Sequence, residues 1–158
     1  MDALQMVQLF GSFFSDQVQP IFHHYRNIRD QNTTSKKRDG MGPELAGQID
    51  HDLDQLFKQF LGAHFPDHEI VSEERASIWT NQRSMWVVDP CDGTHNFLSG
   101  YPTFGSTCTL IQDRRAVFTA IFLPLREMET GNGYCFAVRG HGAGERTKTH
   151  PRSRIHVS

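Results

Sequence analysis

Two carboxylates three residues apart, Asp89 and Asp92, end a near-continuous apolar run in this 158-residue sequence. Holding both ionised beside a buried strand is costly, because like charges repel each other and lose hydration there. A divalent cation would offset that cost. Pro90 rigidifies the turn, Gly93 permits close approach of the backbone, and Thr94 is a good N-cap residue for a following helix. The pattern predicts a site where a metal and a phosphate meet.

A third carboxylate comes from the segment before this run. Ser72, Glu73 and Glu74 end a short predicted strand, and if the two strands are neighbours their ends lie about 5 to 10 Å apart, given a strand spacing of about 4.8 Å. We therefore expect Glu73 to share cations with Asp89 and Asp92. Oxygen ligands without imidazole or thiolate favour Mg²⁺, Mn²⁺ or Ca²⁺ over Zn²⁺. Three carboxylates suit a pair of ions that clamp a phosphoryl group.

These segments resemble the signature of the inositol monophosphatase superfamily, which is an acidic pair on one strand followed by WxxDPxDGTxNF on the next. The acidic pair is Glu73-Glu74, and the longer pattern is matched by Trp86-Val87-Val88-Asp89-Pro90-Cys91-Asp92-Gly93-Thr94-His95-Asn96-Phe97. Further family landmarks are matched by Gly100-Tyr101-Pro102, by Pro124 and by Gly140-His141-Gly142-Ala143. The resemblance covers nearly the whole chain, and it implies metal-assisted hydrolysis of a phosphomonoester without a covalent enzyme intermediate.

The resemblance also implies which residues hold the metal. Glu73 and Asp89 would bind the first Mg²⁺ together with the backbone carbonyl of Cys91, and Asp89 and Asp92 would bind the second. Glu74 would lie behind these ligands rather than among them.

The same resemblance assigns the attacking water and the phosphate. Thr94, paired with Asp50, would orient and deprotonate the water that attacks phosphorus in line. The backbone amides of Gly93, Thr94 and His95 would receive the phosphate. The residue type at the position of His95 varies within the family, so a surface role for its side chain is an equal alternative.

Three features depart from the family pattern. Ser72 replaces the usual glycine before the acidic pair. Residues 46–49 do not match the Thr-x-x-Asp pattern of the family at Asp50, so the alternative for Asp50 is an acid that is exposed to solvent on a helix. Family members are also longer, with a second domain that supplies a last metal-ligating aspartate. We therefore expect residues 1–158 to be an N-terminal metal- and phosphate-binding domain, with the C-terminal domain of the family absent.

Apolar periodicity predicts the elements that position these residues. A three- and four-residue period predicts a helix over 7–28, with Pro20 as a kink or junction, and a second helix over 43–64, while the polar segment 32–42 is predicted to be a loop. Strands are predicted at 69–72, 84–89, 103–111, 116–123, 134–138 and 154–157, the last one ending a glycine-rich hairpin. The fold class is α+β, with two N-terminal helices packed on a mostly antiparallel sheet, as in the N-terminal domain of the family.

Composition narrows the class of partner. The net charge of −2 does not favour nucleic acid or a membrane surface, and no apolar run approaches the roughly 20 residues that cross a bilayer. The three cysteines are widely spaced, and residues 1–17 lack a basic secretion leader, which favours a reducing cytoplasm. We expect a small phosphorylated metabolite as partner, and self-association, since homodimers are common in the family and an exposed sheet face favours association.

Two questions stay open at this point. Inositol monophosphate is the default substrate, while histidinol phosphate, fructose 1,6-bisphosphate and adenosine 3',5'-bisphosphate are handled by relatives of the family. The competing functional class is a non-catalytic module, a truncated or degenerate member that binds metal weakly or serves as an interaction partner.

Overall fold

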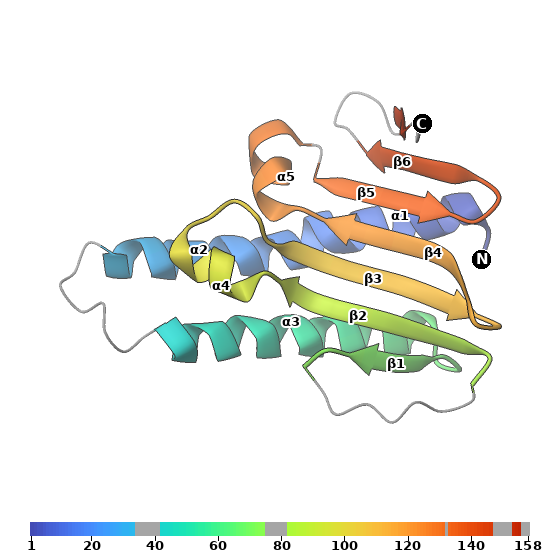
Figure 1. Cartoon of the computed structure of the whole chain (residues 1–158), viewed down its shortest axis with the longest axis horizontal. Helices are drawn as coiled ribbons and strands as arrows, with labels where there is room; N and C mark the ends of the chain where they lie inside the picture. Colours follow the sequence, from blue (N-terminus) through green and yellow to red (C-terminus); the bar gives the residue numbers. More distant parts are fainter. Residues whose placement is uncertain (34–41, 75–81, 132, 147–152, 156–158) are drawn as a thin grey trace.

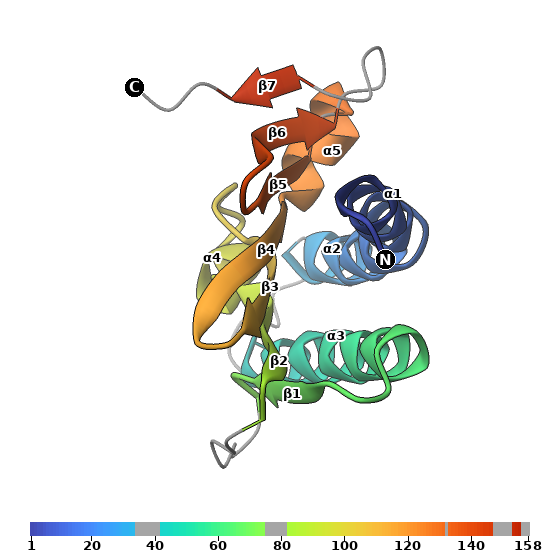
Figure 2. The ribbon, with the colours of Figure 1, turned by 90° about the vertical axis from the view of Figure 1, so that its right-hand side faces the viewer.

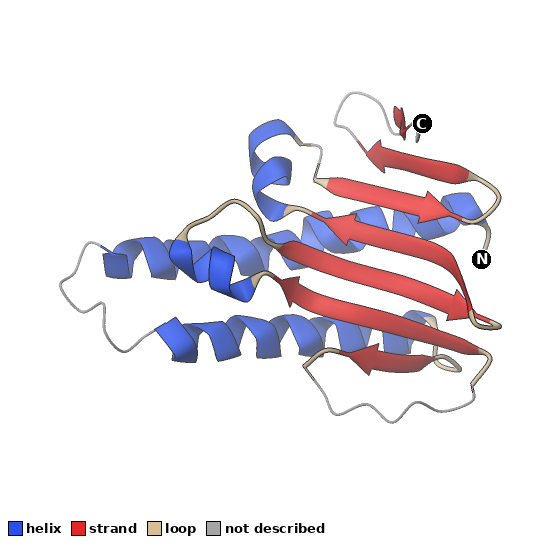
Figure 3. Cartoon of the chain, viewed as in Figure 1, coloured by secondary structure: helices blue, strands red, loops and turns tan. Residues whose placement is uncertain are grey.

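Helices cover one face of a seven-stranded sheet in the structure, a computed structural model that describes residues 1–33, 42–74, 82–131, 133–146 and 153–155 (Figures 1 and 2). The long helices α1, α2 and α3 all lie on the same side of the sheet (Figure 2). Along the chain the long helices come first and the strands follow, and Figure 3 distinguishes the helical layer from the sheet. The α+β prediction, with N-terminal helices on a largely antiparallel sheet, is confirmed.

The first predicted helix is built from three consecutive helical segments. α1 covers Ala3–Phe13, a π-helical turn, η1, covers Phe14–Val18, and α2 covers Gln19–Thr33. Pro20 lies just after the π-helical turn, and because η1 runs directly into α2, the N–H that proline lacks removes one hydrogen bond from the continuous helical ladder. The junction predicted at this proline is confirmed, while the π-helical turn was not predicted.

α3 covers Gly42–His64 and matches the second predicted helix. The loop predicted over 32–42 was drawn too wide, because α2 continues to Thr33 and α3 begins at Gly42; residues 34–41 lie outside the described residues. No helix within the described part of the chain has both the length and the apolar character needed to span a membrane.

The strands follow one another across the sheet in chain order. Their bounds are β1 Glu69–Ser72, β2 Ser84–Asp92, β3 Gly105–Gln112, β4 Arg115–Phe122, β5 Tyr134–Val138, β6 Gly142–Arg146 and β7 Ser153–Ile155. β1 pairs parallel with β2, and every later pair is antiparallel. The prediction of a last strand at 154–157 holds for residues 154–155, and residues 156–158 lie outside the described residues.

Two short helices interrupt the strands; a helix after Asp92 was expected from Thr94, and the second was not predicted. α4, Thr94–Ser99, follows β2, and α5, Pro124–Thr130, connects β4 to β5. Both end at a glycine in the left-handed conformation, Gly100 with φ 80° and Gly131 with φ 68°. Elements of six and seven residues are too short to leave a periodic signal in the sequence.

Aromatic side chains fill the layer between the helices and the sheet. Phe10 of α1 is fully buried, and its ring lies 5.2 Å from that of Phe60 on α3 and 5.1 Å from that of Trp86 on β2. Phe13 stacks on Phe60 with ring centroids 3.8 Å apart. These contacts fix α1 and α3 against β2, the strand that ends in the Asp89 and Asp92 carboxylates.

Candidate metal and phosphate site

The parallel pairing of β1 with β2 brings the two predicted acidic segments to one edge of the sheet. Ser72 is aligned with Val88, and the backbone N–H of Glu73 donates to the Val88 carbonyl at 3.1 Å. Glu73 therefore leaves β1 directly beside Asp89. The expectation that these two strands are neighbours is confirmed.

Asp89 and Glu73 form a closely spaced pair of carboxyl groups. The Asp89 carboxyl group is hydrogen-bonded to Glu73, and one of its oxygens accepts the backbone N–H of Cys91 at 3.2 Å. Burial, followed by the hydrogen bond and charge of Glu73 and the charge of Asp92, raises the pKa of Asp89 to about 7. Like charges are therefore crowded here as the sequence predicted, and a proton relieves part of the repulsion.

A tight turn carries the chain from β2 into α4. Gly93 has a φ of 80°, and a Cβ atom there would lie 2.7 Å from the Thr103 carbonyl oxygen. The buried Ser106 hydroxyl donates to the Pro90 carbonyl at 2.6 Å and ties the end of β2 to β3. The N-cap prediction for Thr94 is wrong, since Gly93 is the N-cap residue and Thr94 begins the helix. The left-handed conformation at the cap position favours glycine, and it leaves the threonine hydroxyl free for other partners.

The Thr94 hydroxyl lies between two of the predicted site residues. It is 2.9 Å from Oδ1 of Asp50, on α3, and 2.8 Å from the carbonyl oxygen of Cys91, so its single proton serves these two acceptors. Asp50 is half-buried, and burial raises its pKa, with a smaller contribution from the charge of Glu73 and opposition from hydrogen bonds with Thr94 and Cys91. Asp50 therefore contacts Thr94 directly instead of standing as an isolated solvated acid, although the preceding residues lack the family pattern.

Further acidic groups surround this pair. Burial raises the pKa of Glu74, and the charges of Asp50, Glu73 and Asp54 add to the effect. Burial also raises the pKa of the Cys91 thiol to about 12, so the thiol stays neutral and the backbone carbonyl is the group with ligand chemistry. The donors are hard oxygens, the kind that Mg²⁺ and Ca²⁺ prefer.

The predicted metal ligands lie at neighbouring strand ends, but their side chains are not arranged around a single metal position. Within the described part of the chain, no three His, Cys, Asp or Glu side chains form a ready-made metal cluster. Glu73 and Asp92 are exposed, while Asp89 is half-buried. The chemistry of the donor set fits a hard divalent cation, and the charge crowding at Asp89 is the repulsion that such a cation would neutralise.

The predicted phosphate ligands lie at the start of α4. α4 begins at Thr94, so the backbone N–H groups of Thr94 and His95 have no acceptor within the helix. The side chain of His95 is exposed. Nothing in the structure tests the phosphate contact itself.

Arg29 on α2 is a site neighbour that the sequence did not reveal. Its guanidinium donates to the Phe97 carbonyl of α4 at 2.6 Å and lies 5.3 Å from the centre of the Phe97 ring. Arg29 also pairs with Asp30 at 2.7 Å. These contacts anchor the end of α4 opposite to Thr94. Sequence patterns could not indicate the contact, because it joins residues 68 positions apart.

Comparison with known proteins identifies relatives of this arrangement. The model of the inositol monophosphatase family matches residues 16–158. A fructose-1,6-bisphosphatase/inositol-1-monophosphatase of Aquifex aeolicus is 26% identical over 106 residues, which are 67% of this chain and 39% of that protein. The Nus factor SuhB of Xylella fastidiosa is 30% identical over 123 residues, 78% of this chain and 41% of that protein.

A solved structure shows the same fold. The crystal structure of an IMPase/NADP phosphatase complexed with NADP and Ca²⁺ superposes with a TM-score of 0.69 at 21% identity, over 92% of this chain and 51% of that one. The chain thus spans about half the length, or less, of the proteins that it matches here.

Proposed function

Because the chain belongs to the inositol monophosphatase family, we propose that it forms the metal- and phosphate-binding half of a divalent-cation-dependent phosphomonoester hydrolase. The observation that carries this proposal is the juxtaposition of the Glu73–Asp89 carboxyl pair with the Thr94–Asp50 hydrogen bond at one edge of the sheet. The first arrangement suits cation binding and the second suits activation of a water. The substrate class is a small phosphorylated metabolite, with inositol monophosphate as the default.

Cations would be held by oxygen atoms from both strands. Glu73, Asp89 and the Cys91 carbonyl would hold one Mg²⁺, and Asp89 and Asp92 would hold a second. Divalent cations at such sites supply Lewis acidity toward phosphoryl oxygens and a nucleophile at neutral pH. The Ca²⁺ in the IMPase/NADP phosphatase structure supports a hard divalent cation in a related fold.

Residues of this chain would then orient the reacting groups. The Thr94 hydroxyl donates its proton toward Asp50 or the Cys91 carbonyl, so its oxygen is available to accept a hydrogen bond from a water. The raised pKa of Asp50 makes that carboxylate a better proton acceptor than an exposed aspartate. The amides of Gly93, Thr94 and His95 would receive the phosphate oxygens.

The second candidate function is a non-catalytic binding module. It is favoured by the absence of a ready-made metal cluster among the described residues and by the relation to a protein named Nus factor SuhB. Under this alternative the chain binds cations weakly and hydrolyses no ester.

Phosphate release separates the two candidates. We would measure inorganic phosphate from inositol 1-phosphate, fructose 1,6-bisphosphate, histidinol phosphate and adenosine 3',5'-bisphosphate, with and without Mg²⁺. The proposal predicts Mg²⁺-dependent release that is lost in Asp92→Asn and retained in Asp113→Asn, a matched control in the exposed β3–β4 turn. A folded chain that releases no phosphate and binds no Mg²⁺ would contradict the proposal. A chain that binds Mg²⁺ but releases no phosphate would contradict hydrolysis by residues 1–158 alone and would favour the binding module.

A further inference from the structure

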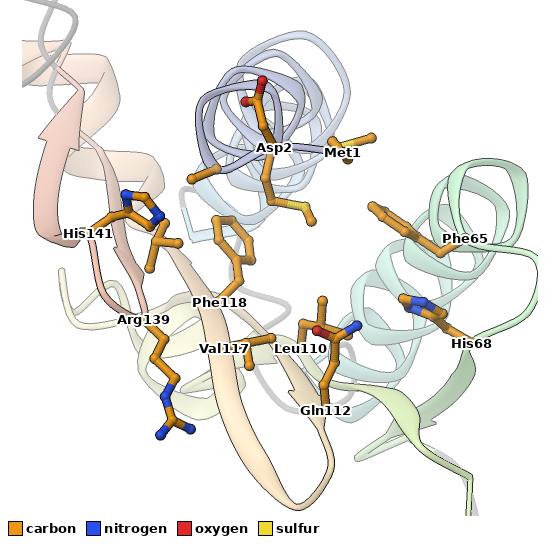
Figure 4. Close-up of a pocket in the computed structure, with 13 residues that line it drawn as sticks. Met1, Asp2, Phe65, His68, Leu110, Gln112, Val117, Phe118, Arg139 and His141 are labelled. Carbon is orange, nitrogen blue, oxygen red and sulfur yellow. The ribbon is translucent and has the colours of Figure 1, made fainter.

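A second hollow lies at the other end of the sheet from the acidic site. It has a volume of about 440 Å³, within the range of roughly 300–1,000 Å³ that small-molecule sites occupy. Its lining comes from the start of α1, the segment between α3 and β1, the strands β3 and β4, and the turn after β5 (Figure 4). The proposed hydrolase does not use this pocket, because β2 begins at this end and carries its carboxylates at the other.

Apolar side chains form the floor of the pocket. Phe118 and Leu110 are buried in the sheet, Met6 approaches from α1, and Phe65 approaches from the segment after α3. Phe118 lies between the His141 side and the Phe65 side of the pocket (Figure 4). Such a floor suits a hydrocarbon or aromatic body, and the Gln112 side chain adds a polar group beside Leu110 (Figure 4).

Basic side chains without partners lie along one wall. Arg139 and His141 are both exposed, and within the described part of the chain neither side chain has a hydrogen bond or an ion pair. The carboxylate among the lining residues is that of Asp2, and it already accepts the backbone N–H of Gln5 at 2.8 Å as a helix cap. The Arg139 guanidinium therefore supplies a positive charge on this wall, the His141 imidazole adds a hydrogen-bonding group, and the Asp2 carboxylate is held at the helix N-terminus by its contact with Gln5.

The opposite wall adds a neutral imidazole. His68 stacks on Phe65 with ring centroids 5.4 Å apart, and burial lowers its pKa, so it is uncharged at neutral pH. Phe65 and His68 lie on the opposite side of the pocket from Arg139 and His141 (Figure 4). The Arg139 guanidinium is thus the positively charged side-chain group of the lining, and the wall opposite to it is formed by a phenyl ring and an imidazole.

We propose that this pocket binds a small amphipathic anion, a carboxylate on an acyl chain or aromatic ring, with its apolar body over Phe118 and its carboxylate at Arg139 and His141. The Arg139 guanidinium points away from Phe118 in this structure (Figure 4). Engaging the ligand therefore requires a new rotamer of an exposed and unpaired side chain, which no contact in the described residues opposes. This site is independent of the proposed hydrolase activity.

Calorimetric titration with octanoate and with 1-octanol tests both halves of the proposal. Octanoate is expected to bind at least tenfold more tightly than 1-octanol, because only octanoate carries the anionic group. Arg139→Gln and His141→Gln should each weaken octanoate about tenfold and leave 1-octanol unchanged. Arg115→Gln, an exposed arginine outside the pocket lining, is the matched control and should bind octanoate as the wild type does.

A filling variant tests the location without removing core packing. Ala3 lines the pocket at the start of α1, and Ala3→Trp should abolish binding of both compounds. The proposal is overturned if octanoate does not bind, if 1-octanol binds as tightly, if the two basic variants match the wild type, or if a folded Ala3→Trp chain binds unchanged.

Discussion

Replacing Gly93 with alanine should cost more stability than replacing Gly100, although both glycines have a φ of 80°. An L-residue in this left-handed conformation costs roughly 1–2 kcal/mol at either position. At Gly100 a new Cβ would meet nothing within 4 Å. At Gly93 it would lie 2.7 Å from the Thr103 carbonyl oxygen and 3.3 Å from Nδ2 of Asn96, which donates to that oxygen at 2.8 Å.

The difference between the two variants isolates this contact. Relieving the overlap displaces the hydrogen bond, which adds about 1 kcal/mol. We therefore expect a loss of about 1–2 kcal/mol for Gly100→Ala and about 2–3 kcal/mol for Gly93→Ala. Urea denaturation, with and without Mg²⁺, measures both. Gly93→Ala should also lose the stabilisation by Mg²⁺, because the turn that follows the metal-binding segment has moved. Equal losses in the two variants would refute this account of the turn.

Three further predictions concern the surroundings of the site. Thr94→Val, which removes the hydroxyl contact with Asp50, should cost about 1 kcal/mol in urea denaturation and at least tenfold in Mg²⁺-dependent phosphate release, with Thr94→Ser restoring both. Burial raises the pKa of Asp89 to about 7 from an unfolded value of about 4, so the folded chain holds a proton that the unfolded chain has lost. The free energy of unfolding of the metal-free wild type should therefore fall, relative to that of Asp89→Asn, as the pH rises from 4 to 7. A difference between the two that does not change with pH would contradict this. Arg29→Gln should accelerate amide hydrogen exchange in α4 around Phe97, and unchanged protection there would show that the contact does not hold the helix.

The apolar periods gave the long elements within a few residues, since each of them buries one continuous face. α3 and β4 show this most clearly: α3 buries Ile49, Leu53 and Phe57 on one face, and β4 buries every second residue from Phe118 to Phe122. The short elements α4 and α5 depend on backbone requirements, such as the left-handed Gly93 and Gly100, that leave no period. The π-helical turn at Phe14–Val18 buries Phe14 and Val18 completely, a demand of tertiary packing that local propensity does not encode.

The residues of the candidate site likewise fall into those that the sequence could predict and those that only the fold brings together. Glu73, Asp89 and Asp92 could be placed together because strand ends and carboxylate spacing are sequence features. The contact between Asp50 and Thr94 followed from resemblance alone, since 44 residues separate the two. Arg29 and Ser106 could not be predicted, because each supports the site through a backbone carbonyl brought near only by the fold.

Calorimetric titration of the chain with Mg²⁺ tests the central claim most directly, because it needs neither a substrate nor the rest of a longer enzyme. The account predicts that the wild type and the exposed-turn control Asp113→Asn bind Mg²⁺ with the same affinity. Asp89→Asn should bind at least tenfold more weakly, since Asp89 is the ligand common to both proposed cations. A wild-type chain that binds no Mg²⁺, or an Asp89→Asn chain that binds it unchanged, would contradict the account.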